Sequence, residues 1–222
     1  MIRLSVDTSF EHLGLCLTRN GVALANYYSL CHRRNATIIF EVIDDLLKSA
    51  ELSLAEVDAY VVNCGPGSYT GVRIGMSVTK TFAQVHDKPV IPVNSLELLA
   101  GQIRHQRTDF PVLLNCTRRE IFHSVFRIVD DHPVAQTAIQ LTSLEKFIEI
   151  SGDVPVVHYR VNPERRKHEP LFEQLVLLPL DYPVPDAQLL DRLGAYKLAS
   201  SAYDPNLPVQ PLYIKRDVEK PL

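Results

Sequence analysis

The sequence predicts an α/β protein, and the order of its segments carries this prediction. Three strand-like segments open the chain, and helical and strand-like segments then alternate up to about residue 100. Apolar residues recur at three- and four-residue spacing in the helical segments, whereas the strand-like segments are short, apolar and β-branched. This order favours a mixed α/β sheet with helices packed on it.

The opening strands are predicted by a short apolar run and a tight-turn signal. Residues 2–6 are apolar and β-branched and end at Asp7-Thr8-Ser9. Residues 14–18 and 22–28 flank Asn20-Gly21, a pair that tolerates positive φ and favours a type I′ turn. We therefore expect a strand followed by a β-hairpin.

Two amphipathic helices are expected next, with a strand and a glycine-rich loop between them. The first helix has an apolar stripe of Ile39, Val42, Ile43, Leu46, Leu47 and Ala50. The elements expected after the hairpin are a helix at 39–50, a capped turn at 53–56, strands at 57–63 and 90–93, and helices at 71–85 and 95–104.

The second half is less regular because ten of the fifteen prolines lie beyond residue 150. Residues 111–116 and 121–129 predict two strands of a second hairpin, and Thr142-Ser143-Leu144-Glu145 has the capping-box form that opens a short helix. A last helix is expected at about 186–202. We expect two lobes, residues 1–98 and a smaller lobe of residues 99–222.

Composition and charge limit the classes of protein to which the chain can belong. No apolar run reaches the roughly 18 residues of a transmembrane helix, and the N-terminal residues lack a signal-peptide pattern, so we expect a cytoplasmic protein that binds no membrane. The net charge is −3, and the sequence shows no stripe of basic residues of the kind that binds the phosphates of tRNA. The four cysteines are scattered among apolar neighbours, which favours buried, inert thiols.

The loop at residues 65–75 holds four of the nine glycines, between an expected strand and an expected helix. No Gly-Lys-Ser/Thr follows for a Walker loop, Thr70 replaces the third glycine of a dinucleotide fingerprint, and Ser68 lacks the glycines of a nucleophile elbow. Two interpretations stay open. Backbone amides at the helix start could bind an anion, or the glycines could serve the turn and a close helix contact through Gly71 and Gly75.

The same loop, read with Lys80 and Ala83, resembles the signature of the TsaB (YeaZ) family. The resemblance runs through residues 1 to about 100 and is specific at the loop. Beyond residue 100 it thins to two patches. Segments that resemble the family are Val6-Asp7-Thr8-Ser9, residues 52–58, the loop at 65–75, residues 93–100, residues 117–122 and residues 209–216.

The resemblance implies an actin-like (ASKHA, ribonuclease H-like) fold of two α/β lobes with mixed sheets. It also implies a non-catalytic scaffold in the synthesis of threonylcarbamoyladenosine (t6A) in tRNA. The two helices of the first lobe would bind the catalytic subunit TsaD, with the ATPase TsaE as a further partner and a homodimer when the chain is alone. ATP and magnesium would be used by the complex rather than bound by this chain, and tRNA would be the substrate of the complex. The interface residues expected from this are Ile39, Ile43, Leu46, Leu47, Gly71, Gly75, Met76, Thr79, Phe82 and Ala83.

The chain departs from the family pattern at two places, and it lacks a metal-binding pair. Asn35-Ala36 stands where His-Ser is frequent, and Asn115 stands in a segment where an acidic residue is usual. The catalytic subunit of the family holds a metal with a His-x-x-x-His pair, and no such spacing occurs here, so neither a catalytic residue nor a metal ligand is expected.

The alternative function is an ATP-dependent enzyme of the actin and sugar-kinase superfamily. In that interpretation an acid at the end of the first strand holds magnesium, and the glycine loop lies near phosphate. The residues that would form such a nucleotide site are Asp7, Thr8, Gly65, Gly67 and Ser68.

Overall fold

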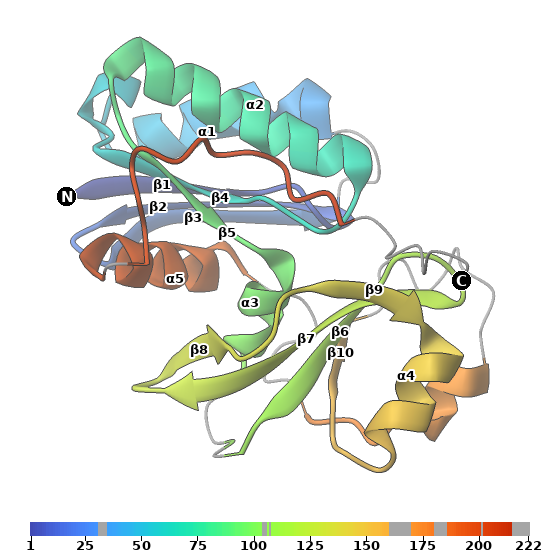
Figure 1. Ribbon diagram of the computed structural model, residues 1–222. Coiled ribbons are helices and arrows are strands. Elements are labelled where there is room, and N and C mark those ends of the chain that lie inside the picture. Colours follow the sequence, from blue (N-terminus) through green and yellow to red (C-terminus); the bar gives the residue numbers. More distant parts are fainter. Residues whose placement is uncertain are drawn as a thin grey trace. The chain divides into compact units, whose positions relative to one another are not determined.

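A computed structural model of the 222-residue chain describes residues 1–30, 35–103, 106, 108–159, 170–179, 186–200 and 202–214 (Figure 1). The chain divides into two compact units. The first comprises Met1–Leu98 with Val184–Leu212, and the second comprises Leu99–Pro183 with Tyr213–Leu222.

The first unit is built on a five-stranded mixed sheet with the order β3-β2-β1-β4-β5. The neighbours of β2 are antiparallel to it, whereas β1, β4 and β5 run parallel. This confirms the predicted mixed α/β sheet. The strands are β1 (Ile2–Asp7), β2 (His12–Arg19), β3 (Val22–Leu30), β4 (Ala59–Asn63) and β5 (Val90–Val93).

The hairpin predicted from Asn20-Gly21 is present between β2 and β3. Asn20 has φ 53° and Gly21 has φ 82°, so both central residues occupy the left-handed region that a type I′ turn requires. The local sequence therefore determines this connection by itself.

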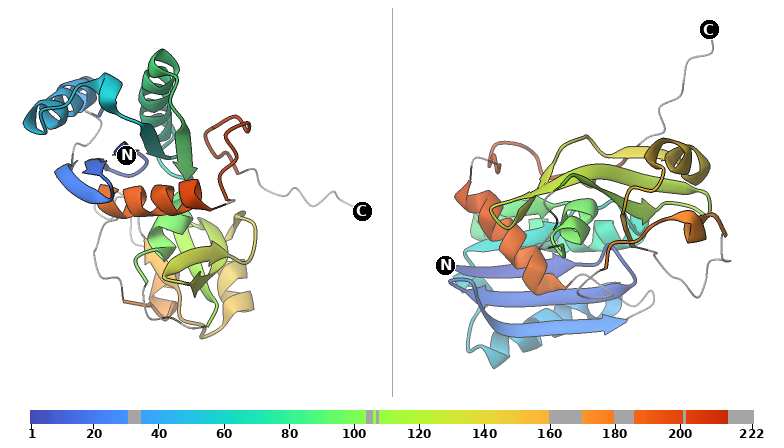
Figure 2. Two further views of the ribbon diagram at one scale, coloured as in Figure 1. Left: turned by 90° about the vertical axis from the view of Figure 1, so that its left-hand side faces the viewer. Right: turned by 90° about the horizontal axis from the view of Figure 1, so that it is seen from below.

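Helices cover both faces of this sheet, as Figure 2 shows. Helices α1 (Asn35–Ser49) and α2 (Tyr69–His86) lie on one face, and α5 (Ala187–Ala199) lies on the other (Figures 1 and 2). A short 3-10 turn, η1 (Leu54–Glu56), precedes β4, and the Glu56 carboxylate accepts a hydrogen bond from the Ser53 amide at 2.8 Å. Helix α3 (Ser95–Ala100) is shorter than the expected 95–104, and residues 104 and 105 lie outside the described part.

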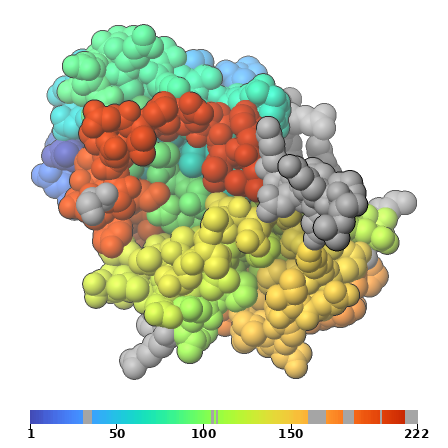
Figure 3. All heavy atoms as spheres, viewed as in Figure 1, coloured from blue at the N-terminus to red at the C-terminus, as the bar shows by residue number. Residues whose placement is uncertain are grey.

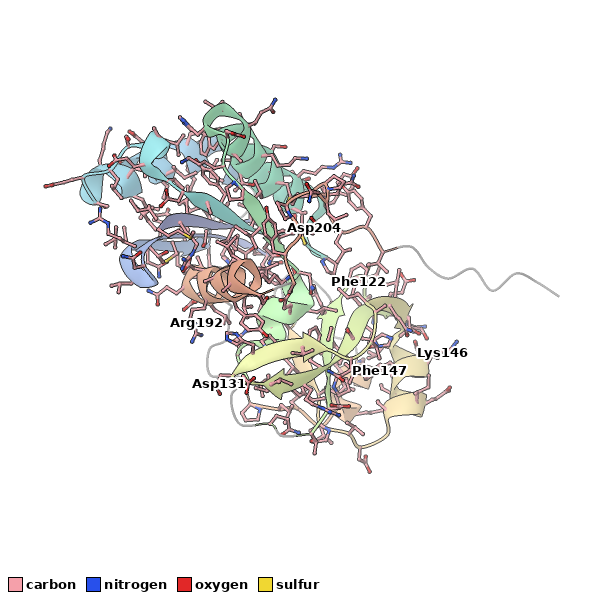
Figure 4. The ribbon with its side chains drawn as sticks, turned by 60° about the vertical axis from the view of Figure 1, so that its left-hand side comes forward. Phe122, Asp131, Lys146, Phe147, Arg192 and Asp204 are labelled. Atoms are coloured by element: carbon pink, nitrogen blue, oxygen red, sulfur yellow. The ribbon has the colours of Figure 1, made fainter. Side chains whose placement is uncertain are left out.

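Helix α5 corrects the expected lobe boundary. It forms near the expected 186–202, and Asp186 caps it by accepting a hydrogen bond from the Leu189 amide at 2.7 Å. However, it packs on β1 and β2 of the first unit, so its expected place in a lobe of residues 99–222 is wrong. Gly194 permits this approach, since a Cβ there would lie 2.4 Å from Val61 Cγ1. Arg192 lies on the exposed side of α5, where Figure 4 labels it.

The second unit contains a sheet with the order β10-β6-β7-β8, and β9 also pairs with β7. The two predicted strands correspond to β6 and β7, whereas β8, β9 and β10 are short and were not predicted. Phe147 of α4, labelled in Figure 4, is buried in the core of this unit. The elements are β6 (Phe110–Asn115), β7 (Glu120–Val129), β8 (His132–Ala135), β9 (Gln140–Ser143), α4 (Leu144–Ser151), β10 (Val157–Tyr159) and η2 (Pro170–Gln174).

The cap of α4 differs by one residue from the expected capping box. Ser143, rather than Thr142, accepts the hydrogen bond from the Lys146 amide, at 3.2 Å. Across the described ranges, none of the helices combines the length and apolarity that crossing a membrane would take.

Candidate functional site

The glycine loop joins β4 to α2, and several of its amides are used inside the chain. The Ser68 amide donates to the Ser9 carbonyl at 2.7 Å, and the Gly65 amide donates to Asn63 Oδ1 at 3.0 Å. Ser68 caps α2, because its Oγ accepts a hydrogen bond from the Gly71 amide at 3.2 Å. Three amide donors that an anion could use are therefore already engaged.

Gly71 and Gly75 serve the contact between α2 and the end of β1. A Cβ on Gly71 would lie 1.9 Å from the Thr8 carbonyl oxygen, and a Cβ on Gly75 would lie 2.5 Å from Thr8 Oγ1. Thr8 Oγ1 donates to the Gly71 carbonyl at 2.7 Å and accepts from the Gly75 amide at 3.0 Å. Both glycines are buried within the first unit, so the expectation that they admit a partner's helix is wrong.

Gly67, in the loop before α2, also allows close backbone packing. Its backbone lies against Ser9, and a Cβ on Gly67 would lie 2.4 Å from the Ser9 carbonyl oxygen. Gly65 has φ 92°, a left-handed conformation that favours glycine. The glycine-rich pattern is thus explained by a turn and by close backbone packing.

Asp7, at the end of β1, is fully buried, and its carboxylate contacts residues of the connection between β1 and β2. Its Oδ1 accepts hydrogen bonds from the Ser9 amide at 2.9 Å and the Ser9 hydroxyl at 2.7 Å. Its Oδ2 lies 3.6 Å from His12 Nε2. Burial by itself raises the pKa of Asp7, but His12 and the Ser9 hydrogen bonds outweigh it, and the pKa lies below its ordinary value.

The residues expected for a nucleotide site are adjacent but mostly enclosed. Asp7, Thr8 and Gly65 are buried, whereas Gly67 and Ser68 are exposed. Ser9 was visible in the sequence as part of the Asp7-Thr8-Ser9 segment, but His12 and Asn63 were missed, since the residues that contact Asp7 and Gly65 here carry no motif of their own. Within the described ranges, no group of three His, Cys, Asp or Glu side chains could hold a metal ion.

Most residues expected at a partner interface lie in the core of the first unit. The two helices bury their regular apolar stripes against the sheet, as amphipathic helices do. The buried members of the expected set, the two glycines aside, are Ile39, Ile43, Leu46, Leu47, Met76, Thr79 and Ala83, and Phe82 is half-buried.

Phe40 of α1 is exposed where α1 and α2 meet, and Val85 is exposed on α2. Phe40 is 56% exposed and Val85 is 70% exposed, and neither was predicted as an interface residue. The Phe40 and Phe82 rings contact edge to face with centroids 6.1 Å apart, and Phe82 also contacts the buried Tyr60 at 6.1 Å. We call Phe40 and Phe82 the α1–α2 seam.

Polar residues and a C-terminal segment lie on the side of α2 away from Phe82, because Arg73 and Lys80 are about 160–180° around the helix from it. Arg73 and Lys80 are exposed on α2, with the Arg73 guanidinium 3.9 Å above the Tyr69 ring. Lys80 Nζ donates to the Val209 carbonyl at 3.1 Å, and the Leu212 amide donates to the Cys64 carbonyl at 2.8 Å. Residues 202–212 therefore run along α2, as Figure 3 shows in orange-red.

The cysteine prediction is confirmed for two residues. Cys16 and Cys64 are buried free thiols, and burial raises their pKa values to about 12 and about 11 respectively. Cys116 is a thiol outside any disulfide and is only half-buried, because it follows β6 at the start of a tight turn. Cys31 lies outside the described residues.

Comparison with known proteins places the chain in a family. The family model described as "TsaD: tRNA N6-adenosine threonylcarbamoyltransferase" matches residues 29–151, more than half of the chain. The chain belongs to this family, in its TsaB (YeaZ) group. The tRNA threonylcarbamoyladenosine biosynthesis protein TsaB of Bacillus subtilis is 32% identical over 127 residues, covering 57% of this chain and 56% of the relative. The Escherichia coli TsaB is 33% identical over 97 residues, covering 44% and 42%.

Solved structures support the fold of this TsaB-group chain. YeaZ from Pseudomonas aeruginosa matches with a TM-score of 0.74 at 23% identity, over 96% of this chain and 99% of that one. The chain is therefore an α/β protein with the actin-like fold that the family resemblance implied. In sequence it spans about half the length of the curated relatives it matches. The segment matched by the family model, residues 29–151, contains both helices of the seam.

Proposed function

We propose that this chain is a non-catalytic scaffold subunit in the synthesis of threonylcarbamoyladenosine in tRNA. It binds a TsaD-type catalytic subunit, and a TsaE-type ATPase works with the pair. ATP and magnesium are used by the partners, and tRNA is the substrate of the assembled complex. The names of the TsaB relatives supply the pathway, and the α1–α2 seam is the observation that carries the binding role.

The seam has the properties of a protein-binding surface. Exposed aromatic side chains dominate the binding energy of protein interfaces when a partner buries them. Phe40 is exposed yet already ordered, because its ring rests on Phe82 and Phe82 rests on the buried Tyr60. A partner that covers Phe40 therefore loses little side-chain entropy on binding. Two helices side by side, with an aromatic ridge between them, fit a partner that presents helices of its own.

The experiment that tests this function uses Phe40→Asp, because Phe40 is exposed and its replacement leaves the core intact. Titration calorimetry with the TsaD-type protein of the same organism should show binding to the wild type and at least about tenfold weaker binding to the variant. Formation of the modified nucleoside in a reconstituted reaction should fall with the binding, because the scaffold acts by holding its partner.

Ile150→Asp is the matched control. Ile150 is also an exposed apolar residue on a helix, but it lies on α4 of the second unit. We expect this variant to bind and to support modification like the wild type. Wild-type binding by Phe40→Asp, or nucleoside formation by the purified chain without any partner, would contradict the proposed function.

A further inference from the structure

Tyr60 of β4 is fully buried, and within the described part of the chain its hydroxyl has no hydrogen-bond partner. The backbone amide of Tyr60 donates to the Pro89 carbonyl at 3.0 Å, so the amide is satisfied and the hydroxyl is not. A buried hydroxyl without a partner lowers the stability of a protein, and most buried polar groups are therefore paired. The hydroxyl is thus a hydrogen-bonding group that the free chain leaves unused.

The surroundings of Tyr60 are apolar, which explains why no neighbouring side chain pairs with its hydroxyl. Directly opposite Tyr60 in the sheet lie Leu4 of β1 and Val90 of β5, and both are buried. The Tyr60 ring belongs to the apolar core to which α1 and α2 also contribute. Burial raises the pKa of the Tyr60 hydroxyl to about 12, so the hydroxyl stays protonated at neutral pH and is able to donate.

Tyr60 lies beneath the α1–α2 seam. The centroid of its ring is 6.1 Å from that of Phe82, and the Phe82 centroid is 6.1 Å from that of Phe40. Phe82 is half-buried whereas Tyr60 is fully buried, so Phe82 covers Tyr60 on the side of the seam. Because side chains stand roughly perpendicular to a sheet, the hydroxyl is the part of Tyr60 farthest from the sheet and nearest the helices. The unpaired donor therefore lies one ring below the surface to which the partner binds in the proposed function.

We propose that the Tyr60 hydroxyl determines which partner the seam accepts, by donating a hydrogen bond to an uncharged polar side chain of that partner. This inference rests on the proposed function, because the partner is the TsaD-type subunit that covers the seam. A hydroxyl or a carboxamide fits the site, since its oxygen accepts the bond and it enters an apolar core at a lower cost than a charged group does. A partner with only apolar side chains at this place leaves the donor unpaired and binds less tightly.

The partner's side chain reaches the hydroxyl when Phe82 turns. Aromatic pairs in contact have centroids about 4.5–7 Å apart, and both contacts of Phe82 lie in the upper half of this range. Rotamer changes of interface side chains are common on binding, even where the backbone moves little. A turn of Phe82 about its Cα–Cβ bond uncovers Tyr60 and leaves the backbone of α2 in place.

Tyr60→Phe tests the proposal, because it removes the hydroxyl and keeps the ring. In the free chain the thermal denaturation midpoint should stay unchanged or rise, since an unpaired buried group is lost. Titration calorimetry with the TsaD-type protein of the same organism should show binding about three- to tenfold weaker than that of the wild type. A purely structural role of the hydroxyl would instead lower the midpoint. Tyr28→Phe is the matched control, because Tyr28 is exposed on β3, and it should change neither measurement.

A double-mutant cycle then identifies the group on the partner. Each Ser, Thr, Asn and Gln on the partner's docking helices is replaced by alanine. One replacement should weaken binding to the wild type but should not weaken binding to Tyr60→Phe any further. A lowered midpoint for Tyr60→Phe, or a cycle in which every replacement acts independently of Tyr60, overturns the proposal.

Phe40→Asp separates this inference from the proposed function. Weak binding by Phe40→Asp together with wild-type binding by Tyr60→Phe overturns the role of the hydroxyl and leaves the scaffold function standing. Wild-type binding by both variants contradicts both. Weak binding by both variants, with an undiminished midpoint for Tyr60→Phe, supports both.

Discussion

The Arg3 guanidinium and the Asp191 carboxylate form a bidentate ion pair that joins β1 to α5. The two residues are 188 positions apart in the sequence. Arg3 Nε donates to Oδ1 at 2.9 Å and Nη2 donates to Oδ2 at 2.6 Å. The hydroxyls of Ser5 and Thr18 also donate to Oδ1, each at 3.2 Å. Both charged side chains are buried, so this pair fixes α5 on the sheet in one position.

Removing one member of this pair should strongly destabilise the protein. Asp191→Ala leaves a buried guanidinium without its counter-charge, a change that typically costs about 3–5 kcal/mol. The double replacement Arg3→Met with Asp191→Leu should cost less than the single one, because no buried charge remains. Urea denaturation followed by circular dichroism measures both.

The exposed pair of Arg127 and Asp109 is the control. Its Nε–Oδ1 distance is 2.6 Å, similar to the buried pair, but both side chains are open to solvent. Asp109→Ala should leave the denaturation midpoint nearly unchanged, because water screens exposed pairs. A midpoint shift for Asp191→Ala no larger than this would contradict the anchoring role.

This ion pair also explains what the sequence could not predict about the fold. The hairpin at Asn20-Gly21 and the stripes of α1 and α2 follow from local propensity and periodicity, and these predictions were correct. The packing of α5 on the first unit depends on Asp191 meeting Arg3 and on Gly194 meeting Val61, and neither contact has a local signal. The predicted lobe boundary therefore misplaced this helix.

The α1–α2 seam could likewise be predicted only in part from the sequence. Ile39 and Phe40 are adjacent apolar residues of one helix, yet Ile39 is fully buried and Phe40 is 56% exposed. Periodicity identifies the stripe that packs on the sheet, but the position of α2 decides which flanking side chain stays uncovered. The glycines of α2 were likewise visible as a pattern, and only the contact with Thr8 shows that they face inward.

Gly71→Ala should destabilise the first unit, because the new methyl group would lie 1.9 Å from the Thr8 carbonyl oxygen. Backbone must shift to relieve this overlap, and overpacking of this kind costs about 1–3 kcal/mol or more. Ser77→Ala, at an exposed position on the same helix, should be neutral or slightly stabilising. Thermal denaturation compares the two, and equal midpoints would show that α2 does not need this close approach.

The ionisation of Asp7 should make stability depend on acid pH. Its pKa is below the ordinary value in the folded protein, so its contribution is present above the unfolded-state pKa of about 3.9 and is lost as pH falls through the folded-state pKa. Asp7→Asn should therefore lose stability at neutral pH and approach the wild type below about pH 4. The exposed Asp153→Asn is the control for charge alone. Denaturation midpoints of the wild type and Asp7→Asn, measured from pH 3 to pH 7, test this prediction. A difference between the two midpoints that stays constant over this range would contradict the role of Asp7.

Cys16 and Cys64 should resist thiol reagents in the folded protein. Only the thiolate reacts, and burial raises their pKa values to about 12 and about 11, so almost no thiolate is present at neutral pH. Cys116 is half-buried and should react first. Labelling with a maleimide followed by peptide mass mapping, before and after denaturation, measures each site. Rapid labelling of Cys16 in the native chain would show that the contact between α5 and β2 opens readily.

The isolated chain should not bind ATP with magnesium, because the groups that would hold the phosphates and the ion are engaged within the first unit. Asp7 Oδ1 accepts two hydrogen bonds from Ser9, and the amides of Gly65, Ser68 and Gly71 donate to Asn63, Ser9 and Ser68. Binding would have to break these contacts, at a cost that the ligand must overcome. Titration calorimetry should give no specific heat with the chain alone and should show binding only once the TsaD-type and TsaE-type partners are added. Tight binding by the chain alone that Asp7→Asn abolishes would instead favour an ATP-dependent enzyme of the actin and sugar-kinase superfamily.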